Sequence, residues 1–172
     1  MPRAQTVVIG VGNPLRGDDG AGPAVVRALR AAGVPEGVGL FEAEAGAVDI
    51  MELWEGAHLA IVVDAVRSGA TPGSIHRLEL PGGTATSRRS SHGLELDEAA
   101  GIAQALGRLP ARLVTFGVEV KACELGAPLS IPVARAVRSV AGEIAGLLLR
   151  PPSRKGLATV VHQALPRQVP RV

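Results

Sequence analysis

The chain has 172 residues, of which 47% are hydrophobic and only 2% aromatic. This length and composition support one aliphatic core and exclude a disordered chain, and the scarcity of aromatic side chains argues against base stacking on nucleic acid. Residues 151–172 carry four basic and no acidic residues, which leaves 14 basic and 16 acidic residues in 1–150. The basic character therefore belongs to the C-terminal residues, and no nucleic-acid partner is expected.

Cysteine content and hydropathy indicate the cellular setting. Cys123 is the single cysteine, so neither an internal disulfide nor a cysteine zinc cage is possible. The first residues lack the apolar core of a signal peptide, and no apolar stretch is long enough to cross a bilayer. We therefore expect a monomer in the reducing cytoplasm, with no membrane partner.

The first predicted element is a buried strand over Thr6–Ile9, an apolar, β-branched run that ends in glycine. A glycine-rich turn follows and contains the adjacent carboxylates Asp18 and Asp19. Helical spacing then begins over Ala24–Leu29. Two acidic side chains thus lie at a strand-to-helix crossing, where open α/β sheets place their ligands.

Two other interpretations of this turn are possible. Gly10 and Gly12 match the opening of a dinucleotide fingerprint, but Leu15 occupies the place of its third glycine, and the two aspartates put negative charge where a pyrophosphate would bind. Asp18 and Asp19 could also simply cap the helix. One aspartate satisfies that role, so a pair suggests that one of them faces something else.

Strands and helices alternate along the rest of the chain. The predicted elements are strand Val38–Glu44, helix Ala47–Trp54, strand His58–Val66, strand Ser74–Leu80, helix Leu94–Leu106, strand Arg112–Val120 and a last helix from the N-cap Ser130 to about Leu149. The connection 67–73 is too short for a crossover helix, so the strand after it should pair antiparallel with the strand before it, as a hairpin. The pattern predicts an α/β fold, a three-layer α/β/α sandwich around a mostly parallel five-stranded sheet with one antiparallel strand. We expect one domain over 1–150, followed by a loose or weakly docked tail over 151–172.

Two further polar residues stand out against this background. Asp64 lies near the end of a strand that is otherwise all core, where a charge is costly unless it is paired, hydrogen-bonded or bound to metal. It could instead cap the turn over 65–69. His92 precedes a predicted helix whose apolar face contains Ala99, Ile102 and Leu106. Together with Asp19, these two residues would suit a divalent transition metal held partly by a substrate. His58, His76 and His162 are interpreted as structural.

Three motifs, taken in order, resemble those of the [NiFe]-hydrogenase maturation endopeptidases. They are Gly10-Val11-Gly12-Asn13-Pro14-Leu15-Arg16-Gly17-Asp18-Asp19-Gly20-Ala21-Gly22, Val62-Val63-Asp64-Ala65 and Ser90-Ser91-His92-Gly93-Leu94. The similarity extends over residues 5–149 and includes Phe116-Gly117-Val118-Glu119.

The resemblance implies a protease that removes a C-terminal extension from a hydrogenase large-subunit precursor after nickel insertion. By position, Asp19, Asp64 and His92 would contact nickel supplied by the precursor, for which other divalent metals could substitute, and would carry the catalysis. Glu42 loosely matches a further acidic position beside the cleft. A non-catalytic, nickel-dependent assembly factor and a nucleotide-binding module remain alternatives.

Overall fold

The computed structural model describes residues 5–44, 46–81 and 94–149 and contains the predicted sheet. Its five strands are β1 (Thr6–Val11), β2 (Val38–Ala43), β3 (Leu59–Val66), β4 (Ile75–Pro81) and β5 (Arg112–Glu119). They lie in the order β2-β1-β3-β5-β4, and only β4 runs antiparallel. Because β1 and β3 are central and covered on both faces, their residues are almost all apolar. The predicted fold class is confirmed. The predicted hairpin of the strands 58–66 and 74–80 is wrong, because β5 pairs along the whole of β3 and β4 adds to the outer side of β5.

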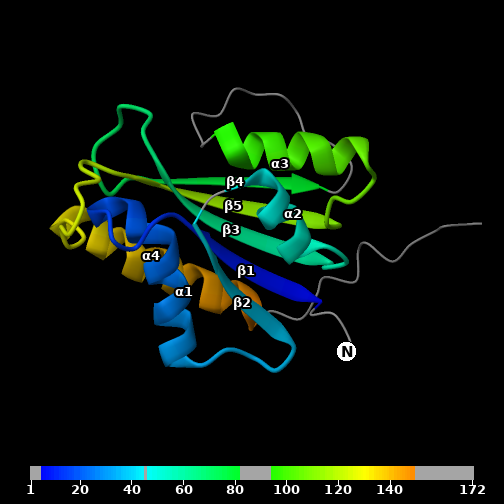
Figure 1. Ribbon diagram of the computed structural model, residues 1–172. Coiled ribbons are helices and arrows are strands. Elements are labelled where there is room, and N and C mark those ends of the chain that lie inside the picture. The colour runs from blue at the N-terminus through cyan, green and yellow to red at the C-terminus, as the bar shows by residue number, and fades with distance from the viewer. Residues whose placement is uncertain (1–4, 45, 82–93, 150–172) are drawn as a thin grey trace, which may run out of the picture.

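Four α-helices cover the two faces of the sheet (Figure 1). They are α1 (Ala21–Ala32), α2 (Ala47–Trp54), α3 (Leu94–Ala105) and α4 (Ile131–Leu148), and a 3₁₀ turn, η1 (Gly17–Gly20), precedes α1. Helices α1 and α4 pack together on one face, and α2 and α3 on the other. Each face has its own aliphatic core, one centred on Val8, Ile61 and Phe116 and the other on Ile9, Val62 and Trp54.

The predicted apolar face of α3 is wrong in part. Ala99 and Ala103 are fully buried, whereas Ile102 and Leu106 are 37% and 59% exposed. Among the α3 side chains that the structure describes, the buried ones are those of Ala99, Ala100 and Ala103, and the helix packs against α2.

In the part of the chain that the structure describes, no helix is long and apolar enough to span a bilayer. The proposed tail, 151–172, and its boundary at residue 150 lie outside the described residues.

Candidate functional site

The loops that follow β1, β3 and β5 gather at one end of the sheet, at the left of Figure 1. Carboxyl ends of parallel strands meet at one edge, and in α/β folds that edge is where ligands bind. Here the first loop contains η1 with Asp18 and Asp19, and Asp64 lies near the end of β3. The loop from Val120 to Ser130 follows β5 and completes this end.

Two glycines bring η1 directly onto the strand ends. A side chain at Gly22, in the first turn of α1, would collide with the carbonyl oxygens of Val11 and Val63. Gly12 has φ +129°, and a Cβ there would collide with the carbonyl oxygen of Asp19. In a dinucleotide fingerprint the third glycine allows the helix to approach the strand closely. Here Leu15 stands at that position, and Gly22, seven residues later, allows the close approach instead.

Asp19 and Asp64 lie on neighbouring segments and are both partly exposed. Asp19 Oδ2 accepts a hydrogen bond of 2.9 Å from the Asn13 N–H. Asp64 lies one residue beyond the last β1–β3 pair, Gly10 with Val63, and η1 contacts β3. The structure therefore brings the two predicted carboxylates to one edge of the sheet.

His92 lies outside the described residues, so its position relative to the two aspartates stays a prediction. Within 5–44, 46–81 and 94–149, no three His, Cys, Asp or Glu side chains are placed to hold a metal ion together. The described residues thus offer two oxygen-donor side chains, a set that suits a divalent cation only if further ligands come from elsewhere.

Arg67 adds a cation to this edge, which the sequence analysis did not anticipate. The interaction with the Cys123 side chain, together with a smaller effect of the Asp19 carboxylate, raises the pKa of Arg67 above its ordinary value. Cys123 is partly buried against the core, in line with its interpretation as a small apolar residue. An exposed guanidinium close to Asp19 gives the site a positive group that could hold a substrate carbonyl or carboxylate.

Asp18 has a different role from its neighbour and caps no helix. It is 1% exposed, and its carboxylate accepts hydrogen bonds from the backbone N–H groups of Ser130 (2.6 Å), Lys121 (3.1 Å) and Ala122 (3.4 Å) and from the Ser130 hydroxyl (2.9 Å). Burial alone would raise the pKa of Asp18, but these hydrogen bonds outweigh it and hold the pKa below its usual value. We call this cluster the loop tether, since it ties η1 to the loop before α4.

The loop tether corrects two predictions. Ser130 does occupy the N-cap position of α4, but its hydroxyl donates to Asp18 and makes no side-chain cap hydrogen bond. Asp18 and Asp19 likewise form no side-chain cap at the start of η1 or α1. A buried carboxylate more than 100 residues distant in sequence competes for the hydroxyl, and such a contact has no local sequence signal.

Glu119, at the end of β5, is a second buried carboxylate that the sequence analysis did not single out. Its Oε1 accepts the N–H groups of Ser68 (2.8 Å) and Gly69 (3.0 Å), and its Oε2 accepts the Ser68 hydroxyl (2.7 Å) and lies 3.3 Å from His76 Nε2. Burial would raise its pKa, but these hydrogen bonds lower it overall. Glu119 therefore organises the turn after β3, two of whose N–H groups donate to it. The signal for Glu119 in the sequence was a single acidic residue at the end of an apolar strand.

Glu42, the loosely matched acid, pairs with two arginines of α1. Its carboxylate oxygens lie 2.8 Å from Arg27 Nη2 and 2.9 Å from Arg30 Nη1. The charge of Glu42 is therefore already compensated at an exposed position.

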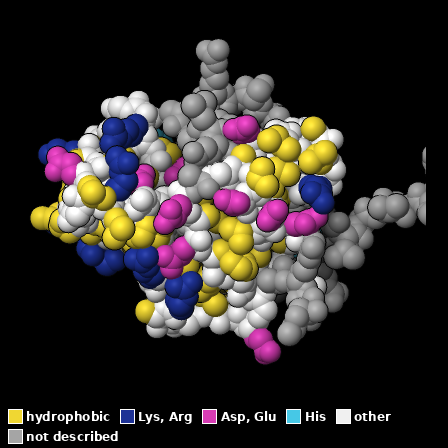
Figure 2. Space-filling model, in the orientation of Figure 1, with side chains coloured by type: hydrophobic (Ala, Val, Ile, Leu, Met, Phe, Trp, Pro, Cys, Tyr) yellow, Lys and Arg dark blue, Asp and Glu magenta, His cyan; other side chains and the backbone are white. Residues whose placement is uncertain are grey.

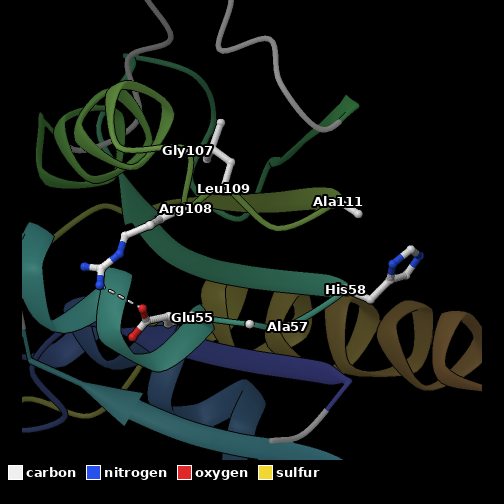
Figure 3. Close-up of a pocket in the computed structure, with 8 residues that line it drawn as sticks. Glu55, Ala57, His58, Gly107, Arg108, Leu109 and Ala111 are labelled. Atoms are coloured by element: carbon white, nitrogen blue, oxygen red, sulfur yellow. Dashed lines mark ion pairs between the residues drawn. The ribbon is translucent and has the colours of Figure 1, made fainter. Parts of the chain in front are cut away.

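A hollow of about 490 Å³ lies at the opposite edge of the sheet (Figure 3). It is formed where β3 and β5 begin, and residues 55–58, 107–109 and 111 line it. An ion pair of 3.0 Å joins Glu55 to Arg108 beside it, and His58 lies at its rim. The hollow is thus separated from the carboxylates by the length of the strands.

The fold and the acidic edge together define an α/β protein with a two-carboxylate site, and comparison with known proteins identifies its family. The family model of hydrogenase maturation proteases (HycI) matches residues 23–147. A hydrogenase expression/formation protein HupD of Bradyrhizobium diazoefficiens is 32% identical over 132 residues, which cover 74% of this chain and 69% of that protein. The chain belongs to the hydrogenase maturation protease family.

Solved structures agree with this assignment. The hydrogenase maturating endopeptidase HybD from E. coli superposes with a TM-score of 0.70 at 25% identity, covering 84% of this chain and 91% of HybD. The maturation protease HycI from Thermococcus kodakarensis has a TM-score of 0.64 at 24% identity over 86% and 94% of the two chains, a likeness of fold.

Proposed function

We propose that this chain is an endopeptidase that removes the C-terminal extension of a [NiFe]-hydrogenase large-subunit precursor after nickel insertion. Membership of the maturation protease family supports the reaction class and the substrate. The observation that carries the proposal for this chain is the placement of Asp19 and Asp64 on adjoining segments at one edge of the sheet.

We further propose that Asp19, Asp64 and His92 engage the nickel ion that the precursor carries. Two carboxylates and one imidazole form a hard-to-borderline ligand set that leaves coordination positions for ligands from the precursor. Nickel bound in this way would act as a Lewis acid on the scissile carbonyl, or on an attacking water. Cleavage would then depend on metal loading, because a precursor without nickel offers this site nothing to bind. The chain itself would act as a monomer in the cytoplasm.

One of the two carboxylates would take the proton from the attacking water. The Asn13 N–H fixes Oδ2 of Asp19, and among the described residues Oδ1 accepts no hydrogen bond. This arrangement holds one carboxylate oxygen in place while the other is available to a metal or a proton.

Single variants of the three residues test the proposal on nickel-loaded precursor. Asp19→Asn, Asp64→Asn and His92→Ala should each lower the rate of processing at least about 100-fold, the usual loss for a general base or metal contact. Glu79→Gln removes an exposed carboxylate that pairs with Arg112 at the opposite edge of the sheet, and should retain the wild-type rate. Far-UV circular dichroism confirms that each variant is folded.

Mass spectrometry of the precursor gives the decisive readout. A product shortened at its C-terminus identifies an enzyme, whereas a precursor that is bound but intact identifies an assembly factor. Wild-type processing rates in all three site variants would contradict the assignment of the site. Thermal stabilisation by nucleotides and not by divalent metals would favour the nucleotide-binding module instead.

A further inference from the structure

We propose that Arg67 is a further catalytic residue of the candidate site, and that Glu119 is the positioning residue that holds it there. The Arg67 guanidinium would donate hydrogen bonds to the oxygen of the scissile carbonyl while negative charge develops on that oxygen. The proposal rests on the proposed function, since it assigns a protein partner to an atom that reacts during cleavage.

Arg67 lies directly after β3, three residues beyond Asp64, and is exposed. The Cys123 side chain and, more weakly, the Asp19 carboxylate raise the pKa of Arg67, so its guanidinium lies within reach of both. Figure 2 shows basic as well as acidic side chains at this end of the molecule. Five other arginines pair with glutamates, namely Arg27, Arg30, Arg77, Arg108 and Arg112. Arg67 forms no ion pair with a carboxylate of the described residues, so its charge is available to a substrate.

The side chain of Glu119 fixes the beginning of the connection that contains Arg67. Val66 pairs with Glu119 in the sheet, and the Glu119 carboxylate accepts the N–H groups of Ser68 (2.8 Å) and Gly69 (3.0 Å). Arg67 thus lies between two residues that are both bound to Glu119. Its side chain therefore starts from a fixed point at the edge of the sheet where Asp19 and Asp64 lie.

The backbone of Glu119 fixes the end of the same connection. Its carbonyl oxygen accepts the Gly73 N–H (2.8 Å), and its N–H donates to the Ser74 carbonyl oxygen (2.9 Å). The Glu119 side chain is almost fully buried, and burial of a carboxylate is costly unless hydrogen bonds compensate it. Here the compensating groups belong to the connection itself and to His76. One buried residue therefore sets the position of the segment 67–74.

Hydrolysis of a peptide bond requires a donor at the carbonyl oxygen. When water adds to the carbonyl carbon, one water proton passes to a carboxylate and an electron pair of the C=O bond moves onto the oxygen. Return of that pair expels the amine, which takes up the proton, while Arg67 stays protonated throughout. The negative oxygen is best stabilised by donors that are held in place before the reaction. Ionised Asp19 and Asp64 only accept hydrogen bonds, whereas a guanidinium keeps its charge and presents several N–H donors in one plane.

Substitution of Arg67 tests its catalytic role on nickel-loaded precursor. Arg67→Gln should lower kcat about 100-fold and change KM less than about threefold, because the contact forms in the transition state. Arg67→Lys keeps the charge but lacks the planar fork, and should regain about tenfold of that loss. Lys121→Gln is the matched control, since Lys121 is an exposed cation at the same end and only its backbone N–H takes part in the loop tether. Its kcat and KM should equal those of the wild type.

A double-mutant cycle tests whether Glu119 acts through Arg67. Glu119→Gln should lower kcat about tenfold when Arg67 is present, because the amide has one acceptor oxygen and holds the turn less firmly. In the Arg67→Gln background the same substitution should lower kcat less than about twofold, since the group that it positions is already absent. A general loss of structure would act equally in both backgrounds, so equal losses would overturn the positioning role. Circular dichroism at the assay temperature confirms that each variant is folded.

Failure of this proposal is distinguishable from failure of the proposed function. If wild-type protein does not shorten the nickel-loaded precursor, the proposed function is wrong, and the role of Arg67 is overturned with it. If the wild type cleaves the precursor and Arg67→Gln retains its kcat, the Arg67 proposal alone is overturned. A higher KM at unchanged kcat also overturns it, because Arg67 would then recognise the bound precursor and not the transition state.

Discussion

Removal of the Asp18 carboxylate should destabilise the end of the molecule that contains the candidate site, and should lower the free energy of unfolding more than substitution of any exposed side chain. Asp18→Ala deletes four hydrogen bonds to a buried anion and leaves the N–H groups of Ser130, Lys121 and Ala122 without their acceptor. Hydrogen bonds to charged groups contribute about 1.5–3 kcal/mol each and are not additive, so we expect a loss of about 4 kcal/mol in the free energy of unfolding. Asp18→Asn keeps the shape of the side chain but has only one acceptor oxygen, and should lower the free energy of unfolding by about 2 kcal/mol.

The lowered pKa of Asp18 also predicts how its contribution to stability changes with pH. Because the folded-state pKa of Asp18 is lowered, its contribution is fully present above the unfolded pKa of about 4 and is lost as the pH falls through the folded value. The stability difference between wild type and Asp18→Asn should therefore be largest at pH 7 and shrink on acidification below about pH 4.

Urea unfolding followed by fluorescence measures these differences. Trp54 is the single tryptophan and is fully buried, so it reports loss of the core between α2 and α3. A difference below about 1 kcal/mol between wild type and Asp18→Ala at pH 7 would refute the reasoning, since it would mean that the freed N–H groups find equivalent partners. So would a difference between wild type and Asp18→Asn that grows as the pH falls.

Two further predictions concern the same end of the sheet. Gly22→Ala should lower the free energy of unfolding by at least about 2 kcal/mol, because its methyl group would collide with the carbonyl oxygens of Val11 and Val63, and a thermal melt no lower than that of the wild type would contradict this packing. Glu119→Ala should lower the free energy of unfolding by about 3 kcal/mol, and Glu119→Gln by about 1 kcal/mol, since the amide oxygen can still accept the Ser68 N–H. Hydrogen exchange at the Ser68 amide should be faster in the alanine variant, and an unchanged exchange rate would show that another group holds the turn.

Much of the fold follows from local pattern. The apolar run of β3, interrupted by Asp64, and the short connection before β4 were sufficient to predict a buried strand followed by an antiparallel one. The partner of β4 was predicted wrongly, because β5, which comes later in the chain, occupies the edge of β3. The strand-to-helix turn also placed Asp19 at the correct edge. By contrast, α1 begins three residues before the predicted helical spacing at Ala24, and Gly22 in its first turn packs directly against β1 and β3.

The roles of the acidic residues were harder to assign. Adjacent in sequence, Asp18 and Asp19 are equivalent to any local rule, yet one is buried in the loop tether and the other is partly exposed beside Arg67. The partners of Asp18 lie more than 100 residues away, and those of Glu119 about 50 residues away. Hydrogen bonds over such separations leave no periodicity or spacing in the sequence.

The sequence by itself therefore determined the class of the fold, the edge at which the candidate site lies and the family resemblance, because hydrophobic period and turn residues act over a few neighbours. Only the tertiary structure decided which carboxylate holds the scaffold and which faces the site. That decision depends on burial and on hydrogen-bond donors supplied by distant segments, which come together only when the chain is folded.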